Sequence, residues 1–317
     1  MHYFKPIIYG VCLTVFFFLI SSCSKEDTDM VRKETLTYKL TGDISEDTLR
    51  SYVQWLQDMG TRFALSDNHK SVAEKIRKRF IGLGYADTEI DSFMISKTFR
   101  NVVYQQMQYN VIATLKGEST SDSVCIMGGH YDNYLTTGDP FATIPGANDN
   151  ASGVAAVMEV ARVMSINNYK PMNTIRFIAF GSEEMGLFGS SAFASEALQT
   201  LHPVKFMLNN DMIAYEPDGN KSNWSVNILD YDNSHFLRRE AEQLCAKYSI
   251  LNYFNDNVSN KYSDSYPFFL NGFKAIFFFS KKIDPNYHTL SDLTSNCNFE
   301  YCREIVKVNC AILVYHN

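Results

Sequence analysis

The chain has 317 residues and a formal net charge of −6, and hydrophobic residues make up 45% of it. This length and apolar content suffice for one large domain with a buried core. Because the net charge is negative and the chain has no long run of basic residues, the sequence argues against nucleic acid as a partner.

The first 22 residues have the pattern of an export signal. Lys5 precedes an apolar stretch, residues 7–20, that is shorter than a membrane-spanning helix. The stretch ends in Ile-Ser-Ser-Cys23, which resembles a lipobox, where cleavage precedes the Cys and a lipid is attached to its sulfur. We expect residues 1–22 to be a lipoprotein signal peptide and Cys23 to carry the lipid. An ordinary secretory signal or an uncleaved anchor is the alternative.

The polar residues after Cys23 predict a lipid-anchored linker over residues 23–44, followed by one domain over residues 45–317. The acidic run that begins this linker resembles a surface-export signal of some Gram-negative lipoproteins. The expected location is therefore a bacterial cell-envelope membrane, the outer membrane, on its periplasmic or its surface face. The oligomeric state is left open.

Five cysteines follow Cys23, an odd number that cannot all pair. Cys125 lies in an apolar strand and is most simply a buried free thiol. Cys297 and Cys302 could form a local disulfide in an exported protein, although spacing alone does not establish it.

In chain order, the hydrophobic spacing predicts alternating helices and strands. The expected helices span residues 45–59, 69–83, 152–164, 187–198, 234–248 and 300–315. The expected strands span residues 109–115, 124–127, 174–180, 204–208, 225–229 and 275–279. Ser45 or Asp47 can cap the first helix. The alternation indicates the α/β class, with a mixed, mostly parallel central sheet covered by helices on both faces.

A set of histidines and carboxylates stands at expected strand ends and loops. The segments are GGHYDNY, GANDNASG, FGSEEMGLFGS, NNDMIAY and YHTLSD, and the residues are His130, Asp132, Asp149, Glu183, Glu184, Asp211 and His288. Ligands of an open α/β sheet collect at the carboxyl ends of its strands. Imidazole and carboxylate groups that meet there form a ligand set for zinc with a position open to water. Two adjacent Glu residues offer one side chain to a metal and one to proton transfer.

These five ordered motifs resemble the co-catalytic zinc aminopeptidases, peptidase family M28, over roughly residues 45–317. The resemblance implies a zinc-exopeptidase, phosphorylase/hydrolase-like fold and two Zn²⁺ ions per chain. It implies that His130 and Asp211 bind one zinc, with Asp132 accepting the second N–H of the imidazole. It also implies that Asp149 bridges both ions and is followed by a cis peptide bond to Asn150.

The same resemblance assigns the remaining site residues. Glu184 and His288 would bind the second zinc, and Asp292 would help to hold the loop of His288. Glu183 would be the general base that passes a proton from water to the leaving amine. The implied function is a metallo-aminopeptidase that hydrolyses the N-terminal peptide bond of oligopeptides, with the free α-amine near the second zinc.

The chain departs from the family pattern at one position. The family often has Ser-Asp-His before an aromatic residue, whereas this chain has Ser263, Asp264 and Ser265. Asp264 is retained, and substrate orientation can differ. Tyr262, Tyr266 and Phe268 are candidates for a specificity pocket, with core packing as the alternative.

Three other functions are alternatives on this fold. A glutaminyl-peptide cyclotransferase has the same fold and one zinc, and a carboxypeptidase of the family recognises the other terminus. A non-catalytic binding protein on a degenerate scaffold would have lost a ligand or the base, and no such loss is visible. The preferred N-terminal residue is not determined by these motifs.

Overall fold

The computed structural model describes residues 28–120, 123–201, 203–256 and 260–317. The expected signal peptide and Cys23 lie outside these ranges. One eight-stranded sheet has the order β1-β2-β4-β3-β5-β8-β6-β7. The strands are β1 (Thr88–Phe99), β2 (Val102–Leu115), β3 (Val124–His130), β4 (Thr174–Phe180), β5 (Val204–Asn210), β6 (Ser225–Leu229), β7 (Asn252–Phe254) and β8 (Ala275–Ser280).

The four central strands, β4, β3, β5 and β8, run parallel, so their carboxyl ends meet at one edge. Every residue of β3 is buried, because helices cover both faces of the sheet. The Gly128–Gly129 pair in this strand is required by close packing. A Cβ at Gly129 would stand 2.7 Å from the Asn210 carbonyl oxygen of the neighbouring strand. These small residues thus allow β3 to pack closely against β5, with His130 at its carboxyl end.

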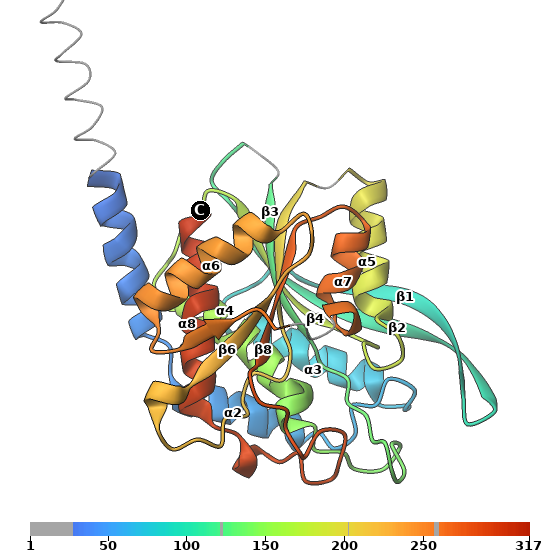
Figure 1. The fold of residues 1–317 in the computed structure, drawn as a ribbon. Helices are drawn as coiled ribbons and strands as arrows, with labels where there is room; N and C mark the ends of the chain where they lie inside the picture. The colour runs from blue at the N-terminus through green and yellow to red at the C-terminus, as the bar shows by residue number, and fades with distance from the viewer. Residues whose placement is uncertain (1–27, 121–122, 202, 257–259) are drawn as a thin grey trace, which may run out of the picture.

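Helices pack on both faces of the sheet (Figure 1). They are α2 (Glu46–Gln57), α3 (His69–Gly82), α4 (Ser152–Ile166), α5 (Phe188–Gln199), α6 (His235–Tyr248), α7 (Ser265–Leu270) and α8 (Phe299–Tyr315). The larger core joins one face to α2, α3, α4, α6 and α8, and a smaller core joins the other face to α5 and α7. This architecture confirms the predicted α/β class with a mixed, mostly parallel sheet.

All the predicted helices and strands are present, and β1, β7 and α7 are among the elements that were not predicted. The strand β1 pairs with β2 along its whole length, and the resulting hairpin projects beyond the body of the domain in Figure 1. The strand β7 is a short edge strand with every residue exposed. The helix α7 is only six residues long and contains Pro267. Short or exposed elements leave little hydrophobic periodicity in a sequence.

The structure differs from the expected linker over residues 28–42, which are helical. Thr37, Leu40 and Thr41 on this helix are buried, and Leu36 packs against the main core. The Lys33 ammonium donates to the Tyr315 carbonyl, and Glu34 pairs with Lys247 of α6. The buried stripe of this helix alternates Leu with Thr at helical spacing, and the surrounding polar residues gave the segment the composition of a linker.

The five cysteines after Cys23 are all free thiols. Cys125 is buried as predicted, and Cys297 and Cys302 do not form a disulfide. Within the part of the chain that the structure describes, no helix combines the length and the apolar character needed to cross a membrane.

Replacing Leu40 by Ala tests whether the helix of residues 28–42 belongs to the folded domain. Leu40 is 0% exposed within the main core, so we expect Leu40→Ala to lower the free energy of unfolding by about 2–5 kcal/mol. Urea denaturation of the chain from residue 28 onward measures this change. Met30, 63% exposed on the same helix, is the matched control, and Met30→Ala should change stability by less than about 0.5 kcal/mol. Equal, small effects of both substitutions would contradict the packing.

Candidate functional site

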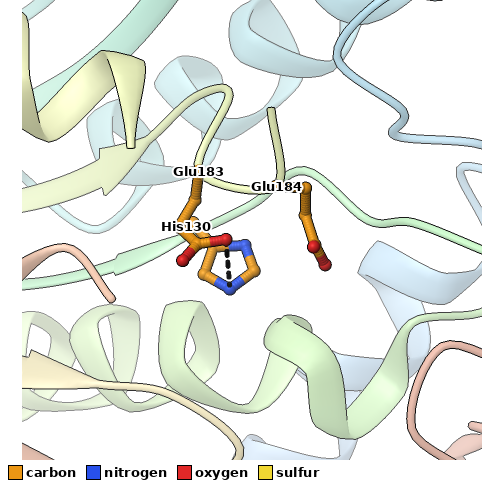
Figure 2. Close-up of side chains that lie close together, drawn as sticks. All are labelled: His130, Glu183 and Glu184. Carbon is orange, nitrogen blue, oxygen red and sulfur yellow. Dashed lines mark ion pairs between the residues drawn. The ribbon is translucent and has the colours of Figure 1, made fainter. Parts of the chain in front are cut away.

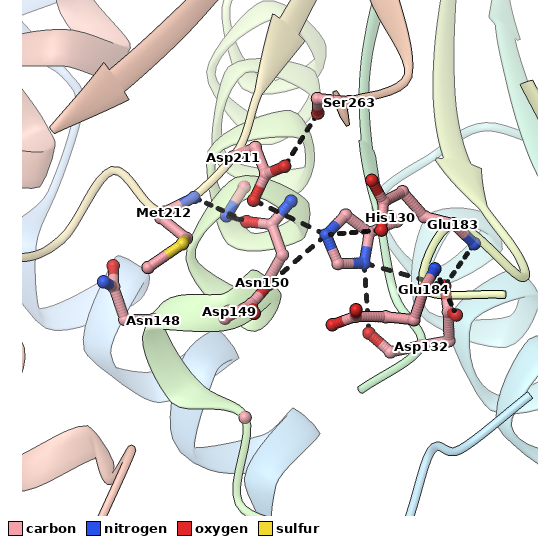
Figure 3. Close-up of polar contacts among 12 residues, drawn as sticks. His130, Asp132, Asn148, Asp149, Asn150, Glu183, Glu184, Asp211, Met212 and Ser263 are labelled. Carbon is pink, nitrogen blue, oxygen red and sulfur yellow. Dashed lines mark hydrogen bonds and ion pairs between the residues drawn. The ribbon is translucent and has the colours of Figure 1, made fainter. Parts of the chain in front are cut away.

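The residues singled out in the sequence meet at the carboxyl edge of the central strands. His130 is the last residue of β3, Glu183 and Glu184 follow β4, and Asp211 follows β5. His288 reaches the same place from the loop after β8. Asp149 lies just before α4, and Figure 3 shows its side chain directed at the His130 ring.

His130, Asp149 and Asp211 form a first three-ligand group. The His130 Nε2 lies 3.4 Å from Asp149 Oδ1 and 3.5 Å from Asp211 Oδ1. These separations exceed an ordinary hydrogen bond. Two ligand atoms of a tetrahedral zinc ion stand about 3.3 Å apart, given bonds of roughly 2.0–2.1 Å. Asp211 Oδ1 is also buried and accepts no hydrogen bond in the described part of the chain, so the donor set fits a metal ion.

Asp149, Glu184 and His288 form a second group. The His288 Nε2 lies 2.9 Å from Glu184 Oε1 and 3.1 Å from Asp149 Oδ2. Asp149 therefore faces one imidazole with each of its two oxygens. Each group brings its three ligand atoms within 4.8 Å of one another. Both sets of ligands that the sequence predicted are thus brought together around one shared carboxylate.

The Asp149 loop is fixed by hydrogen bonds from both sides. Asp292 accepts the backbone N–H groups of Asn148 (2.7 Å) and Asp149 (2.9 Å), so its carboxylate binds this loop rather than the His288 loop to which it belongs. The peptide bond from Asp149 to Asn150 is cis, as the family resemblance implied. The Asn150 amide donates to the Asn210 carbonyl and accepts the N–H of Gly153, which ties the loop to β5 and α4.

Asp132 is placed differently from the prediction. The His130 Nδ1 lies 3.1 Å from the Asp132 backbone carbonyl and 3.6 Å from the carboxylate. The nearest acceptor for the ring is therefore the carbonyl. The carboxylate instead accepts the backbone N–H groups of Glu183 (3.0 Å) and Glu184 (3.2 Å). One residue thus orients the imidazole and anchors the turn that carries both glutamates, as Figure 3 shows.

Glu183 stands beside the first group without belonging to it. Its Oε2 lies 3.9 Å from His130 Nε2, and Figure 2 shows its carboxylate next to the imidazole. With His130 and Glu184 it forms a third group whose ligand atoms lie within 4.8 Å of one another. The side chain is mostly buried and lines the cleft above the site. This position leaves the carboxylate of Glu183 facing the cleft, where it can contact a substrate.

The site buries more negative than positive charge. Burial raises the pKa of Glu183 well above its ordinary value. Burial and the nearby Asp149 charge raise the pKa of Glu184 to about 8. Burial by itself lowers the pKa of His288, but its hydrogen bonds to Asp149 and Glu184 outweigh that effect and raise the pKa to about 10. The raised pKa values of Glu184 and His288 mean that the site favours added positive charge, which a divalent metal would also supply.

A cleft of about 750 Å³ opens above these residues. Of the aromatic candidates, Tyr262 lines the cleft, whereas Tyr266 and Phe268 pack in the smaller core. Asp264 is fully buried, and burial raises its pKa to about 7. Ser265, which stands in place of the family His, shares a hydrogen bond with the Tyr231 hydroxyl at 2.9 Å.

The sequence analysis missed several residues of the cleft and its surroundings. Ser263 donates a hydrogen bond to Asp211 Oδ2 at 2.7 Å. Asn227, Phe277 and Phe279 form part of the cleft wall. Their segments read simply as buried strands, because nothing in a strand sequence shows which face borders a cleft.

Comparisons with known proteins agree with this geometry. The model of peptidase family M28 matches residues 110–313. A probable zinc metalloprotease of Pyricularia oryzae is 34% identical over 54% of this chain and 36% of its own length. A probable leucine aminopeptidase of Trichophyton verrucosum is 31% identical over 63% of this chain and 54% of its own length. The chain thus spans between about a third and about a half of these two relatives.

Solved structures share the fold. LapB of Legionella pneumophila superposes with a TM-score of 0.75 at 23% identity, over 89% of this chain and 74% of its own. A glutaminyl cyclase of Fimbriiglobus ruber superposes with a TM-score of 0.70 at 19% identity, over 86% of this chain and 96% of its own. Since the family model spans more than half of the sequence and contains every residue of the two ligand groups, the chain belongs to peptidase family M28.

Proposed function

We propose that the protein is a zinc-dependent aminopeptidase that removes the N-terminal residue of oligopeptides. The observation that carries this proposal is the pair of complete ligand groups that share Asp149, with Glu183 beside them at the floor of a cleft. The names of the relatives in Pyricularia oryzae and Trichophyton verrucosum point to the same metal and the same reaction.

We assign two zinc ions to the site. His130 and Asp211 would hold the first and Glu184 and His288 the second, and Asp149, which faces both imidazoles, would help to hold both. Two adjacent cations repel each other, and a carboxylate between them offsets that repulsion. Zinc bound there would polarise the scissile carbonyl and lower the pKa of a water molecule.

Glu183 would carry the proton. Burial raises the pKa of Glu183, so the carboxylate binds a proton more readily, and added positive charge nearby would lower that pKa. The carboxylate accepts a proton from the attacking water and delivers it to the leaving amine nitrogen. The hydrogen bond from the Glu183 N–H to Asp132 keeps the backbone in place during both transfers.

Exopeptidase action follows from the charge of the cleft. The buried carboxylates around Asp149 and Glu184 favour the ammonium group of a free N-terminus over the uncharged interior of a longer chain. A cyclotransferase needs only one zinc, whereas both ligand groups are complete here. The carboxypeptidase alternative is supported by Lys261 and Lys281 in the cleft, although Lys281 pairs with Asp256.

The lipid anchor at Cys23 and the envelope location also belong to this proposal, on the strength of the lipobox-like sequence alone. Mass spectrometry of the chain released from membranes would reveal an acylated Cys23. A chain that begins upstream of Cys23 and carries no lipid would contradict the anchor.

Replacing Glu183 by Gln separates metal binding from catalysis. The amide keeps the size of the side chain but cannot accept the proton, so we expect kcat to fall by roughly 10²–10⁴-fold with the zinc content unchanged. Elemental analysis and hydrolysis of peptides with free N-termini measure the two effects. Glu196 is exposed on α5, and Glu196→Gln should leave both unchanged. Near-normal turnover in Glu183→Gln would remove the assigned role.

The pH dependence of stability gives a second test. The pKa of Glu184 is raised to about 8 and that of His288 to about 10, so both groups hold protons more tightly in the folded state. Their contribution to stability is lost as the pH rises through these values. We expect the melting temperature of the metal-free protein to fall between pH 6.5 and 8.5.

The stabilisation of the protein by zinc should have the opposite pH dependence, because zinc binds the deprotonated ligands. The increase in melting temperature on adding zinc should therefore grow over the same pH range. Thermal unfolding with a chelator and with added zinc measures both trends. In His288→Gln the zinc-induced rise in melting temperature should grow less with pH. If that rise is independent of pH in the unsubstituted protein, Glu184 and His288 are not zinc ligands.

A further inference from the structure

The wall of the cleft away from the ligand groups is one face of the β6–β8 strand pair. Asn227 of β6 lies opposite Phe279 of β8, and Phe277 lies two residues away on the same strand. Side chains alternate between the two faces of a strand. Val226, Ile228, Ile276 and Phe278 accordingly point into the main core. The opposite face presents Asn227, Phe277 and Phe279 to the cleft.

Asn227 is the polar group of this otherwise aromatic wall. The residue is 1% exposed, and its Oδ1 is buried without a hydrogen-bond partner among the described residues. Within residues 28–120, 123–201, 203–256 and 260–317 its side chain makes no hydrogen bond, whereas those of Asn110, Asn150 and Asn210 all do. A buried amide normally finds a partner, because leaving its polar atoms unpaired is unfavourable.

We infer that Asn227 determines specificity by hydrogen-bonding a neutral N-terminal side chain that ends in a carboxamide, glutamine first. This inference rests on the proposed aminopeptidase function. A carboxamide offers one donor and one acceptor, which match the acceptor and donor of the Asn227 amide. The methylene stem of glutamine would pack against Phe277 and Phe279. The Asn227 amide is uncharged, so it hydrogen-bonds a neutral carboxamide without the ion pair that a charged side chain would need.

The preference for glutamine over a nonpolar side chain would come from a hydrogen bond to Asn227 that the nonpolar side chain cannot make. A side chain of similar length without polar atoms, such as methionine, fills the same space but leaves the Asn227 amide unpaired. A site built to hydrogen-bond its substrate rejects an analogue that lacks the bonding group. The expected preference for glutamine over methionine is roughly tenfold to a hundredfold in kcat/KM.

The test is the ratio of kcat/KM for two peptides that differ only in an N-terminal Gln or Met. In the unsubstituted chain from residue 28 onward, with zinc bound, the ratio should favour Gln. In Asn227→Leu, which keeps the size of the side chain and removes its polarity, the ratio should fall by roughly tenfold to a hundredfold. The ratio comes from one preparation, so it does not depend on the fraction of folded protein.

Asn252 supplies the matched control. It lies in the adjacent strand β7, is exposed, and donates to the carbonyls of Ser222 and Trp224 outside the cleft wall. Asn252→Leu should keep the unsubstituted ratio. An unchanged ratio in Asn227→Leu, with hydrolysis intact, would overturn the specificity inference alone. Loss of ammonia from the Gln peptide without chain shortening, or no chelator-sensitive hydrolysis of either peptide, would overturn the proposed function instead.

Discussion

The carboxylate of Asp149 is the group around which the site is arranged. Each of its oxygens faces a different imidazole, at 3.4 Å from His130 and 3.1 Å from His288. Several carboxylates crowd into the same buried space, and that arrangement is unfavourable unless cations or protons offset the charge. Burial, together with the neighbouring carboxylates, raises the pKa values of Glu183 and Glu184. The same crowding of carboxylates favours a cation bound at the site.

Backbone hydrogen bonds, rather than packing alone, hold the ligands at their positions. Asp292 binds the N–H groups that precede the shared carboxylate, and Asp132 binds those of the two glutamates. In each case a buried acid from one loop fixes the backbone of another. Charged acceptors make stronger hydrogen bonds than neutral ones. The loops can therefore keep a fixed geometry even though loops are ordinarily the mobile parts of a domain.

Arg62 extends this support into the core. Its fully buried guanidinium donates to the carbonyls of Leu56, Tyr131, Pro145 and Gly146. These contacts join the loop after β3 to the loop before Asp149. Burial lowers the pKa of Arg62 to about 10, while the charges of Asp292, Asp132 and Asp149 act in the other direction. A fixed positive charge beneath the site thus offsets part of its negative charge.

The sequence by itself determined most of the helix and strand pattern and pointed to the candidate metal ligands. Long periodic segments such as β4 and α8 follow from local hydrophobic spacing, and the motif residues follow from chemistry at strand ends. Only the tertiary structure decided which atoms meet: that the Asp132 carbonyl faces His130, that the helix of residues 28–42 packs on the domain, and that Asn227 borders the cleft. Those outcomes depend on contacts between segments far apart in the chain, and the local spacing of hydrophobic residues does not reveal such contacts.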